Sequence, residues 1–379
     1  MTGCSQRALD HIRAVQKSIF VLSLVLLIGL VPTVTHTFQL DPYSTLNAET
    51  GKFVRAGLVS KIPPDFLPIH ERLTLQAVAA AKIDDAYKTD AFITGLIKGV
   101  RWNDDPLGMA TERPLIWLAS YKHSCLSRQK IAPDWDLLYR THCGDMQFLH
   151  AMASSSRECA GDTISKILMW TEFAYQVASG KISKHWRFRS MSKFLEPESA
   201  KLFSSLLTMN GKRRTLWHPE TLFTRVCTRV LSRGVIIPGR RPTESKCIDT
   251  KDSSPPQLIQ DIALGSLIHV LQDSFSGSHV LRENSKQLGS SMVIGVGKII
   301  QFGNYRVQDS DLHEKADTNL IETGPSDGYN LKEVTSRLIE LVVQQRLDKR
   351  DRWSEARAIL AEVLSVAKPE ITPGDLGYR

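Results

Sequence analysis

"SSPPQLIQDIALGSLIHVLQDSFSGSHV", residues 253–280, is the stretch from which the fold class can be argued. Ser254 is a suitable N-cap, Pro255 suits the first helical position, and Gly277 suits the residue at which a helix stops. The residues between them are mostly apolar and predict one long helix. His269 and Asp273 are four residues apart on that helix, so both side chains lie on one face with Cβ atoms about 6 Å apart.

The rest of the chain also favours helices. Helix-forming or amphipathic patterns cover residues 71–81, 90–100, 331–347 and 353–367. Alternating strand patterns are scarce, and residues 291–300, "SMVIGVGKII", are the best exception. We therefore predict an all-α fold built as a multi-helix bundle.

Composition bounds the class of protein. The chain has 379 residues, of which 42% are hydrophobic and 23% are charged, and this excludes wholesale disorder. Its formal net charge of +8 suits an anionic partner such as phospholipid, nucleic acid or a phosphate ester, without choosing among them.

The cysteines exclude one kind of metal site. Six are present, at positions 4, 125, 143, 159, 227 and 247. No two have the CxxC spacing of a thiolate zinc knuckle. Disulfides can form in an oxidising compartment, but the sequence leaves their pairing open.

The N-terminus carries a membrane-targeting pattern. Arg7, Arg13 and Lys17 precede an uncharged apolar run at residues 18–34, and no charge follows until Asp41. This pattern is typical of a signal peptide, and the run is also nearly long enough to be an uncleaved anchor. In both cases the basic flank stays in the cytoplasm, so we expect the rest of the chain to be periplasmic or extracellular.

A basic region interrupts the helical patterns. We place an insertion at residues 181–250, in which basic residues from Lys181 to Lys246 alternate with Trp186, Phe188 and Trp217. Such a surface suits phosphates or a membrane, and a solvated insertion is the alternative. We expect it to form a flap or side lobe outside the ligand-bearing helices.

The polar pair at residues 269 and 273 has a third candidate partner. His279 follows Asp273 by six residues, beyond the expected helix end, so the chain can turn it back toward the same place. Two imidazoles and a carboxylate suit zinc, which accepts nitrogen and oxygen ligands. A surface helix that carries His-x3-Asp is the alternative.

Further His and Asp residues occur in several predicted helices or at their ends. They are His70 in "IHERLT", Asp104 and Asp105 in "WNDDP", His142 and Asp145 in "THCGD", and His313 and Asp317 in "LHEKAD". A helical bundle can bring such scattered residues together when each helix contributes a ligand to one core site.

These motifs resemble the zinc-dependent phospholipases C of bacteria and the single-strand-specific zinc nucleases of fungi and plants. His269, Asp273 and His279 fit the family pattern His-x3-Asp-x5-His without a gap. The remaining motifs follow in the family's order, with His313-x3-Asp317 in the nuclease form. The resemblance implies a helical zinc hydrolase domain over residues 41–379, preceded by a signal peptide or anchor at residues 1–40.

The resemblance also implies a ligand set for two or three zinc ions. Asp104, His142, His269 and Asp273 would hold the first ion, and His279, His313 and Asp317 the second, while Asp273 would bridge to a third ion shared with His70. Asp104 would also be catalytic, as acceptor of the proton of the attacking water.

His150 competes with His142 for the same role. We prefer His142, because Asp145 three residues later completes the family motif. His150 is then interpreted as a core histidine that is satisfied by a backbone carbonyl.

The sequence is compatible with three functions. The first is a phospholipase C that releases phosphorylated head groups. The second is an exported nuclease acting on single-stranded nucleic acid. The third is a non-catalytic, zinc-stabilised, membrane-associated protein, which an eight-residue ligand set disfavours, because structural zinc sites usually close with four ligands.

Overall fold

The computed structural model describes part of the chain, all of it within the unit from His36 to Arg379. The described residues are 44–47, 52–55, 69–104, 137–206, 208–209, 212–213, 218–223, 254–283, 286–288, 291–293, 297–308 and 331–377. Among them, no helix is long and apolar enough to cross a membrane. The apolar run at residues 18–34 and the expected boundary at residue 40 lie outside the described residues.

The described part is mostly helical, as the predicted all-α class requires. The helices are α2 (Ile69–Ala80), α3 (Asp90–Trp102), α6 (Leu137–His142), α7 (Ala160–Ala178), α8 (Phe188–Met191), α9 (Pro197–Leu206), α10 (Pro219–Phe223), α11 (Pro256–Asp273), α13 (Leu331–Asp348) and α14 (Trp353–Val363). Short 3-10 turns are η2 (Asp85–Tyr87), η4 (Gln147–His150) and η5 (Ser192–Phe194).

The strands are short and pair in twos, all antiparallel. They form the ladders β1–β2 (Ser44–Asn47, Lys52–Arg55), β3–β4 (Thr208–Met209, Lys212–Arg213), β5–β8 (Val280–Arg282, Ile299–Phe302) and β6–β7 (Lys286–Leu288, Ser291–Val293). The continuous strand expected at residues 291–300 is wrong. Its two ends belong to β7 and β8, which pair with different partners.

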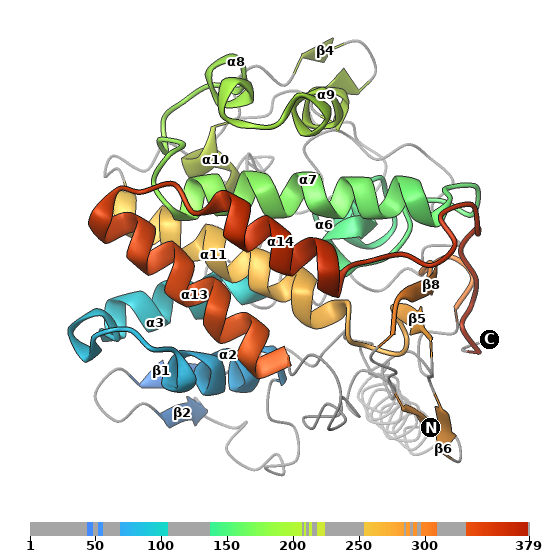
Figure 1. The fold of residues 1–379 in the computed structure, drawn as a ribbon, viewed down its shortest axis with the longest axis horizontal. Helices are drawn as coiled ribbons and strands as arrows, with labels where there is room; N and C mark the ends of the chain where they lie inside the picture. The colour runs from blue at the N-terminus through green and yellow to red at the C-terminus, as the bar shows by residue number, and fades with distance from the viewer. Residues whose placement is uncertain are drawn as a thin grey trace, which may run out of the picture. The chain divides into compact units, whose positions relative to one another are not determined.

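Helix α11 is the central element of the bundle. Figure 1 shows α3 and α2 on one side of it, α7 on another, and α13 and α14 across it. All residues from Asp261 to Asp273 are buried, so α11 is covered on every face. It begins one residue later than expected, with Pro255 as the N-cap, and ends at Asp273, before Gly277.

Helices α3 and α11 cross with their backbones in near contact. A Cβ placed on Gly99 would lie 2.1 Å from the carbonyl oxygen of Ile262, and one on Gly265 would lie 2.2 Å from that of Leu96. Contacts below 3 Å are not tolerated by real Cβ atoms. Both positions therefore require glycine, and its cost in helix propensity is offset by the close packing it allows.

An aromatic cluster joins α7 to the rest of the core. Trp102 stacks on Trp170 with ring centroids 5.7 Å apart, and Phe223 meets Trp102 edge-on at 5.1 Å. The indole Nε1 of Trp102 donates to the carbonyl oxygen of Leu222 at 3.1 Å, so this buried indole has its hydrogen-bond partner. Trp102 is thus a core residue.

The insertion is not wholly a side lobe. Helix α9 packs on α7, as Figure 1 shows near the top of the view, while α10 packs on α11 and places Phe223 in the core. Trp186, expected on the surface, is partly buried and stacks on Phe194 at 4.7 Å. Trp217 and the side chain of Phe188 lie outside the described residues.

The glycine crossing yields a stability prediction. We expect Gly99→Ala and Gly265→Ala each to lower the free energy of unfolding by about 3 kcal/mol, because the new methyl group meets backbone that cannot turn aside. Denaturant unfolding followed by circular dichroism measures the change.

Gly161→Ala is the matched control, because this helical glycine has its nearest contact at 3.1 Å and to a proline side chain. Its effect should stay within about 1 kcal/mol. Equal stability of all three variants would contradict the close crossing.

Candidate metal centre

Seven side chains of metal-binding type meet at the C-terminal end of α11. They are His70 in α2, Asp104 just after α3, His142 at the end of α6, His150 at the end of η4, His269 and Asp273 in α11, and His279 in the following turn. All are buried, and His142 is the most accessible at 7% exposed. The structure thus brings together six of the eight predicted ligands.

Asp273 lies at the centre of this group, and each of its ionic partners among the described residues is an imidazole. Its Oδ2 lies 2.9 Å from His269 Nε2, 3.0 Å from His150 Nδ1 and 3.6 Å from His279 Nδ1. Its Oδ1 lies 3.2 Å from His70 Nε2. A buried carboxylate whose ionic partners are imidazoles needs either protons on those rings or a bound cation as its countercharge.

Most separations among four of the donor atoms are close to those of a tetrahedral metal site. His150 Nδ1 and His269 Nε2 lie 3.2 Å apart, and Asp104 Oδ1 lies 3.6 Å from the first and 3.7 Å from the second. With the two contacts of Asp273 Oδ2, five of the six edges between these atoms span 2.9–3.7 Å. Metal–ligand bonds of about 2.0–2.1 Å imply tetrahedral edges of about 3.3–3.4 Å.

Hydrogen bonds orient three of the histidine rings. His269 Nδ1 donates to the carbonyl oxygen of Val100 at 2.7 Å, and His279 Nδ1 donates to that of His150 at 2.5 Å. His70 Nδ1 donates to Gln272 Oε1 at 2.5 Å. Each ring then carries its lone pair on Nε2, and a metal-binding histidine commonly has this arrangement.

His150 differs from its sequence interpretation. Its Nδ1 faces Asp273 and His269 and not a backbone carbonyl, and among the described residues its Nε2 has no hydrogen-bond partner. Ala151, directly after it, has a φ of +50°, in the left-handed region that non-glycine residues seldom adopt. The backbone thus accepts a strained turn at the residue that follows His150.

The buried surroundings keep His150, His269 and Asp273 in the protonation states that bind a cation. Desolvation lowers the pKa of His150, and it lowers that of His269 to about 3, so both rings are neutral at pH 7. Burial alone would raise the pKa of Asp273, but the surrounding imidazoles and their hydrogen bonds hold it well below its usual range. Asp273 is therefore an ionised carboxylate beside the neutral rings of His150 and His269.

Amide side chains hold the ligand-bearing elements in place. Asn103 donates to the carbonyl oxygen of Leu149 at 2.8 Å and accepts from Ser266 Oγ at 2.6 Å, which ties the end of α3 to η4 and α11. Gln272 donates to Thr74 Oγ1 at 3.0 Å and so ties α11 to α2. These residues fix Asp104, His150 and His70 through the neighbouring backbone.

The other predicted residues have different surroundings. His142 lies beside His150, with ring centroids 4.7 Å apart, and it offers a ligand atom near those of Asp104 and His150. Asp145 accepts two hydrogen bonds from Arg140, each at 2.7 Å, and is not in the cluster. Asp105, His313 and Asp317 lie outside the described residues.

Sequence reasoning overlooked some residues of the site. Tyr305 has its ring centroid 5.9 Å from those of His142 and His150 and 6.0 Å from that of His279. Gln272 and Asn103 directly precede the predicted ligands Asp273 and Asp104, and this position in the sequence could have indicated that they belong to the site. Tyr305 had none, because its place depends on the pairing of β8 with β5.

Cys143 is disulfide-bonded, and Cys159 is a free thiol. Neither belongs to the groups of described residues that can hold a metal ion. The candidate centre is thus made of imidazoles and carboxylates, as expected from the absence of a CxxC motif.

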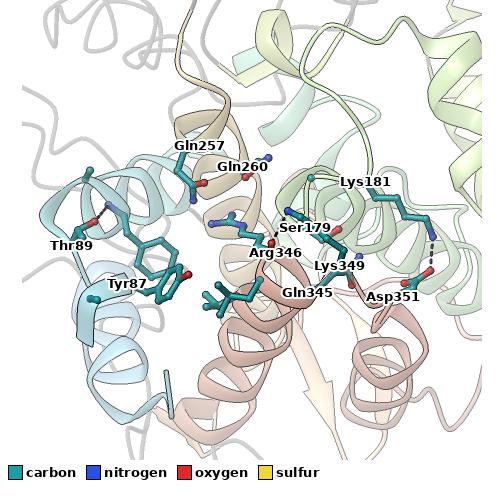
Figure 2. Close-up of a pocket in the computed structure, with 16 residues that line it drawn as sticks. Tyr87, Thr89, Ser179, Lys181, Gln257, Gln260, Gln345, Arg346, Lys349 and Asp351 are labelled. Carbon is teal, nitrogen blue, oxygen red and sulfur yellow. Dashed lines mark hydrogen bonds and ion pairs between the residues drawn. The ribbon is translucent and has the colours of Figure 1, made fainter. Parts of the chain in front are cut away.

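A hollow of about 630 Å³ lies away from this centre and is shown in Figure 2. Gln257 and Gln260, from the N-terminal part of α11, line it together with Arg346 of α13. Gln260 precedes Asp273 by thirteen positions, roughly 20 Å along the helix axis. This pocket is therefore separate from the histidine–aspartate cluster.

Comparisons with protein-family models, curated proteins and solved structures found no match to this chain. The buried geometry alone shows that three overlapping groups could hold a metal ion. They are His70–Asp104–His269, Asp104–His142–His150 and His150–His269–Asp273.

The buried charge of Asp273 yields a test for a bound metal. We expect Asp273→Asn to lose at least one metal ion per chain, measured by elemental analysis. Adding zinc at about 100 times its dissociation constant should stabilise only the wild type, by about 2.7 kcal/mol.

Asp90→Asn, an exposed aspartate in the first turn of α3, is the control and should keep the metal content and the response to zinc. A wild-type melting temperature that does not change on adding zinc would show that the cluster is only a polar core.

Proposed function

We propose that the chain is a zinc-dependent phosphodiester hydrolase, most closely a phospholipase C. The observation that carries the proposal is the close spacing of donor atoms of Asp104, His150, His269 and Asp273, among which five separations are 2.9–3.7 Å. A buried group of two neutral imidazoles and two carboxylates, with no thiolate, suits zinc. The charge of this ligand group also supports zinc, because a divalent cation would offset the two buried carboxylates.

The proposed ligand set differs in one respect from the one implied by the resemblance. His150 replaces His142 as the fourth ligand beside Asp104, His269 and Asp273. His142 and His70 each lie in a separate group with Asp104, which supports a second or third ion close to the first. His279, with His313 and Asp317, stays a proposed ligand of the second ion.

Zinc ions a few ångströms apart would supply an activated water at neutral pH and neutralise the phosphate oxygens. Asp104 is proposed to accept the proton of the attacking water. Asp104, 3% exposed, and His142, 7% exposed, are the least deeply buried of the seven side chains, which supports access of a substrate from their side. Gln272 and Asn103 would keep His70 and Asp104 in position.

Phospholipid is the favoured substrate, because the proposed export and the exposed Arg187 and Arg189 of the insertion suit an anionic membrane surface. Single-stranded nucleic acid is the second candidate, favoured by the nuclease form of the motif at His313 and Asp317. A non-catalytic zinc-stabilised protein is the third, and overlapping donor groups beyond a single four-ligand site disfavour it.

An assay with two substrates tests this proposal. The purified full chain should hydrolyse phosphatidylcholine vesicles faster than single-stranded DNA, lose activity in chelator and recover it with zinc. Asp104→Asn should lower the rate by about 10²- to 10⁴-fold, the usual contribution of a positioned general base. Asp90→Asn should act like the wild type.

Faster hydrolysis of single-stranded DNA than of phosphatidylcholine would favour a nuclease instead. No hydrolysis of either substrate by a zinc-loaded chain would reject an enzyme of this class and leave the zinc-stabilised protein.

We also propose that the chain is exported, either cleaved after the apolar run or anchored by it. The basic flank before residues 18–34 supports this. A reporter fused after Arg379 should be active only outside the cytoplasm. Activity confined to the cytoplasm would contradict the proposal.

A further inference from the structure

A second group of metal-binding side chains lies apart from the buried cluster. His185, His218 and Glu220 each offer one ligand atom, and these atoms lie within 4.8 Å of one another. The group joins the segment before α8 to the first turn of α10. It has no residue in common with the cluster around Asp273.

The His218 ring is held with one nitrogen toward the group. Its Nδ1 donates to the carbonyl oxygen of Lys184 at 3.0 Å, which leaves the lone pair on Nε2. A ring nitrogen bonded to a backbone carbonyl is the usual second shell of a metal-binding histidine. The backbone is fixed as well, because His218 N donates to Thr221 Oγ1 at 3.0 Å.

Glu220 provides a buried carboxylate at the base of the group. Its side chain is 3% exposed, and its Oε1 accepts from Ser254 N at 2.9 Å and from Lys184 Nζ at 3.4 Å. Its other oxygen, Oε2, lies 3.3 Å from His185 Nδ1. The two carboxylate oxygens therefore have different partners. Oε1 contacts the backbone N–H of Ser254 and the Lys184 ammonium, and Oε2 contacts the His185 ring.

His185 completes the group from the solvent side. Its side chain is 58% exposed, and its Nδ1 lies 3.3 Å from Glu220 Oε2, close to the roughly 3.4 Å edge of a tetrahedral site. Two imidazoles and one carboxylate form a ligand set that zinc uses where one coordination position stays open. An ion here would face solvent and exchange faster than one in the buried cluster.

We propose that His185, His218 and Glu220 form a second, solvent-facing site for zinc or a similar divalent transition metal. The bound ion would clamp the segment at residues 184–185 to α10 and, through Glu220 and Ser254, to the start of α11. The site is independent of the proposed hydrolase function, because it uses none of that function's residues.

Zinc binding to the full chain tests the proposal. After chelator treatment and dialysis, the wild type should bind one more zinc ion per chain than His185→Ala or His218→Ala, measured by competition with a chromophoric chelator. Loss of outer-shell partners alone weakens metal binding about 10- to 100-fold, so loss of a ligand should weaken this site at least tenfold. Arg187→Ala, exposed and two positions from His185, is the matched control.

Two further measurements distinguish a lost site from a misfolded chain. The zinc bound by the buried cluster and the circular dichroism spectrum should be unchanged in His185→Ala. Zinc should slow proteolysis after Lys193 in the wild type and in Arg187→Ala, but not in His185→Ala. Equal zinc content in the wild type and both histidine variants would overturn the proposal, as would equal protection from proteolysis.

Discussion

The structure depends on one buried carboxylate. Asp273 ends the central helix with four imidazoles within 3.6 Å, and the side chains of this group are almost wholly excluded from water. A charge in that position needs partners with correct geometry or a countercharge. Four separate segments of the chain supply these rings or position them, so the packing around α11 is arranged about this residue.

Close helix packing makes that arrangement possible. Gly99 and Gly265 let the backbones of α3 and α11 come together, and the carbonyl oxygen of Val100 then lies 2.7 Å from His269 Nδ1. That carbonyl belongs to the last turn of α3, where backbone acceptors lack helical partners. One contact therefore completes the end of one helix and orients a candidate ligand on the other.

Part of the site could be predicted because helical spacing is local. His269 and Asp273 share a face of α11 at any place in the fold, and the turn after the helix returns His279 to them. His150 could not be predicted in this way, since its ring is aimed by a short 3-10 turn and a left-handed residue. Asp145, three residues after His142, binds Arg140 and lies outside the cluster, because its surroundings depend on the packing of α6.

Sequence alone determined the helical character of the described chain, the positions of α3, α11, α13 and α14 within a few residues, and the histidine and aspartate residues that α11 carries. Tertiary structure decided that α10 of the insertion belongs to the core, that residues 291–300 divide between two ladders, and which nitrogen of each ring faces Asp273. The physical reason is the distance along the chain over which each effect acts. Periodicity and capping act over a few residues, whereas a cluster of donor atoms 3–4 Å apart depends on how distant segments pack.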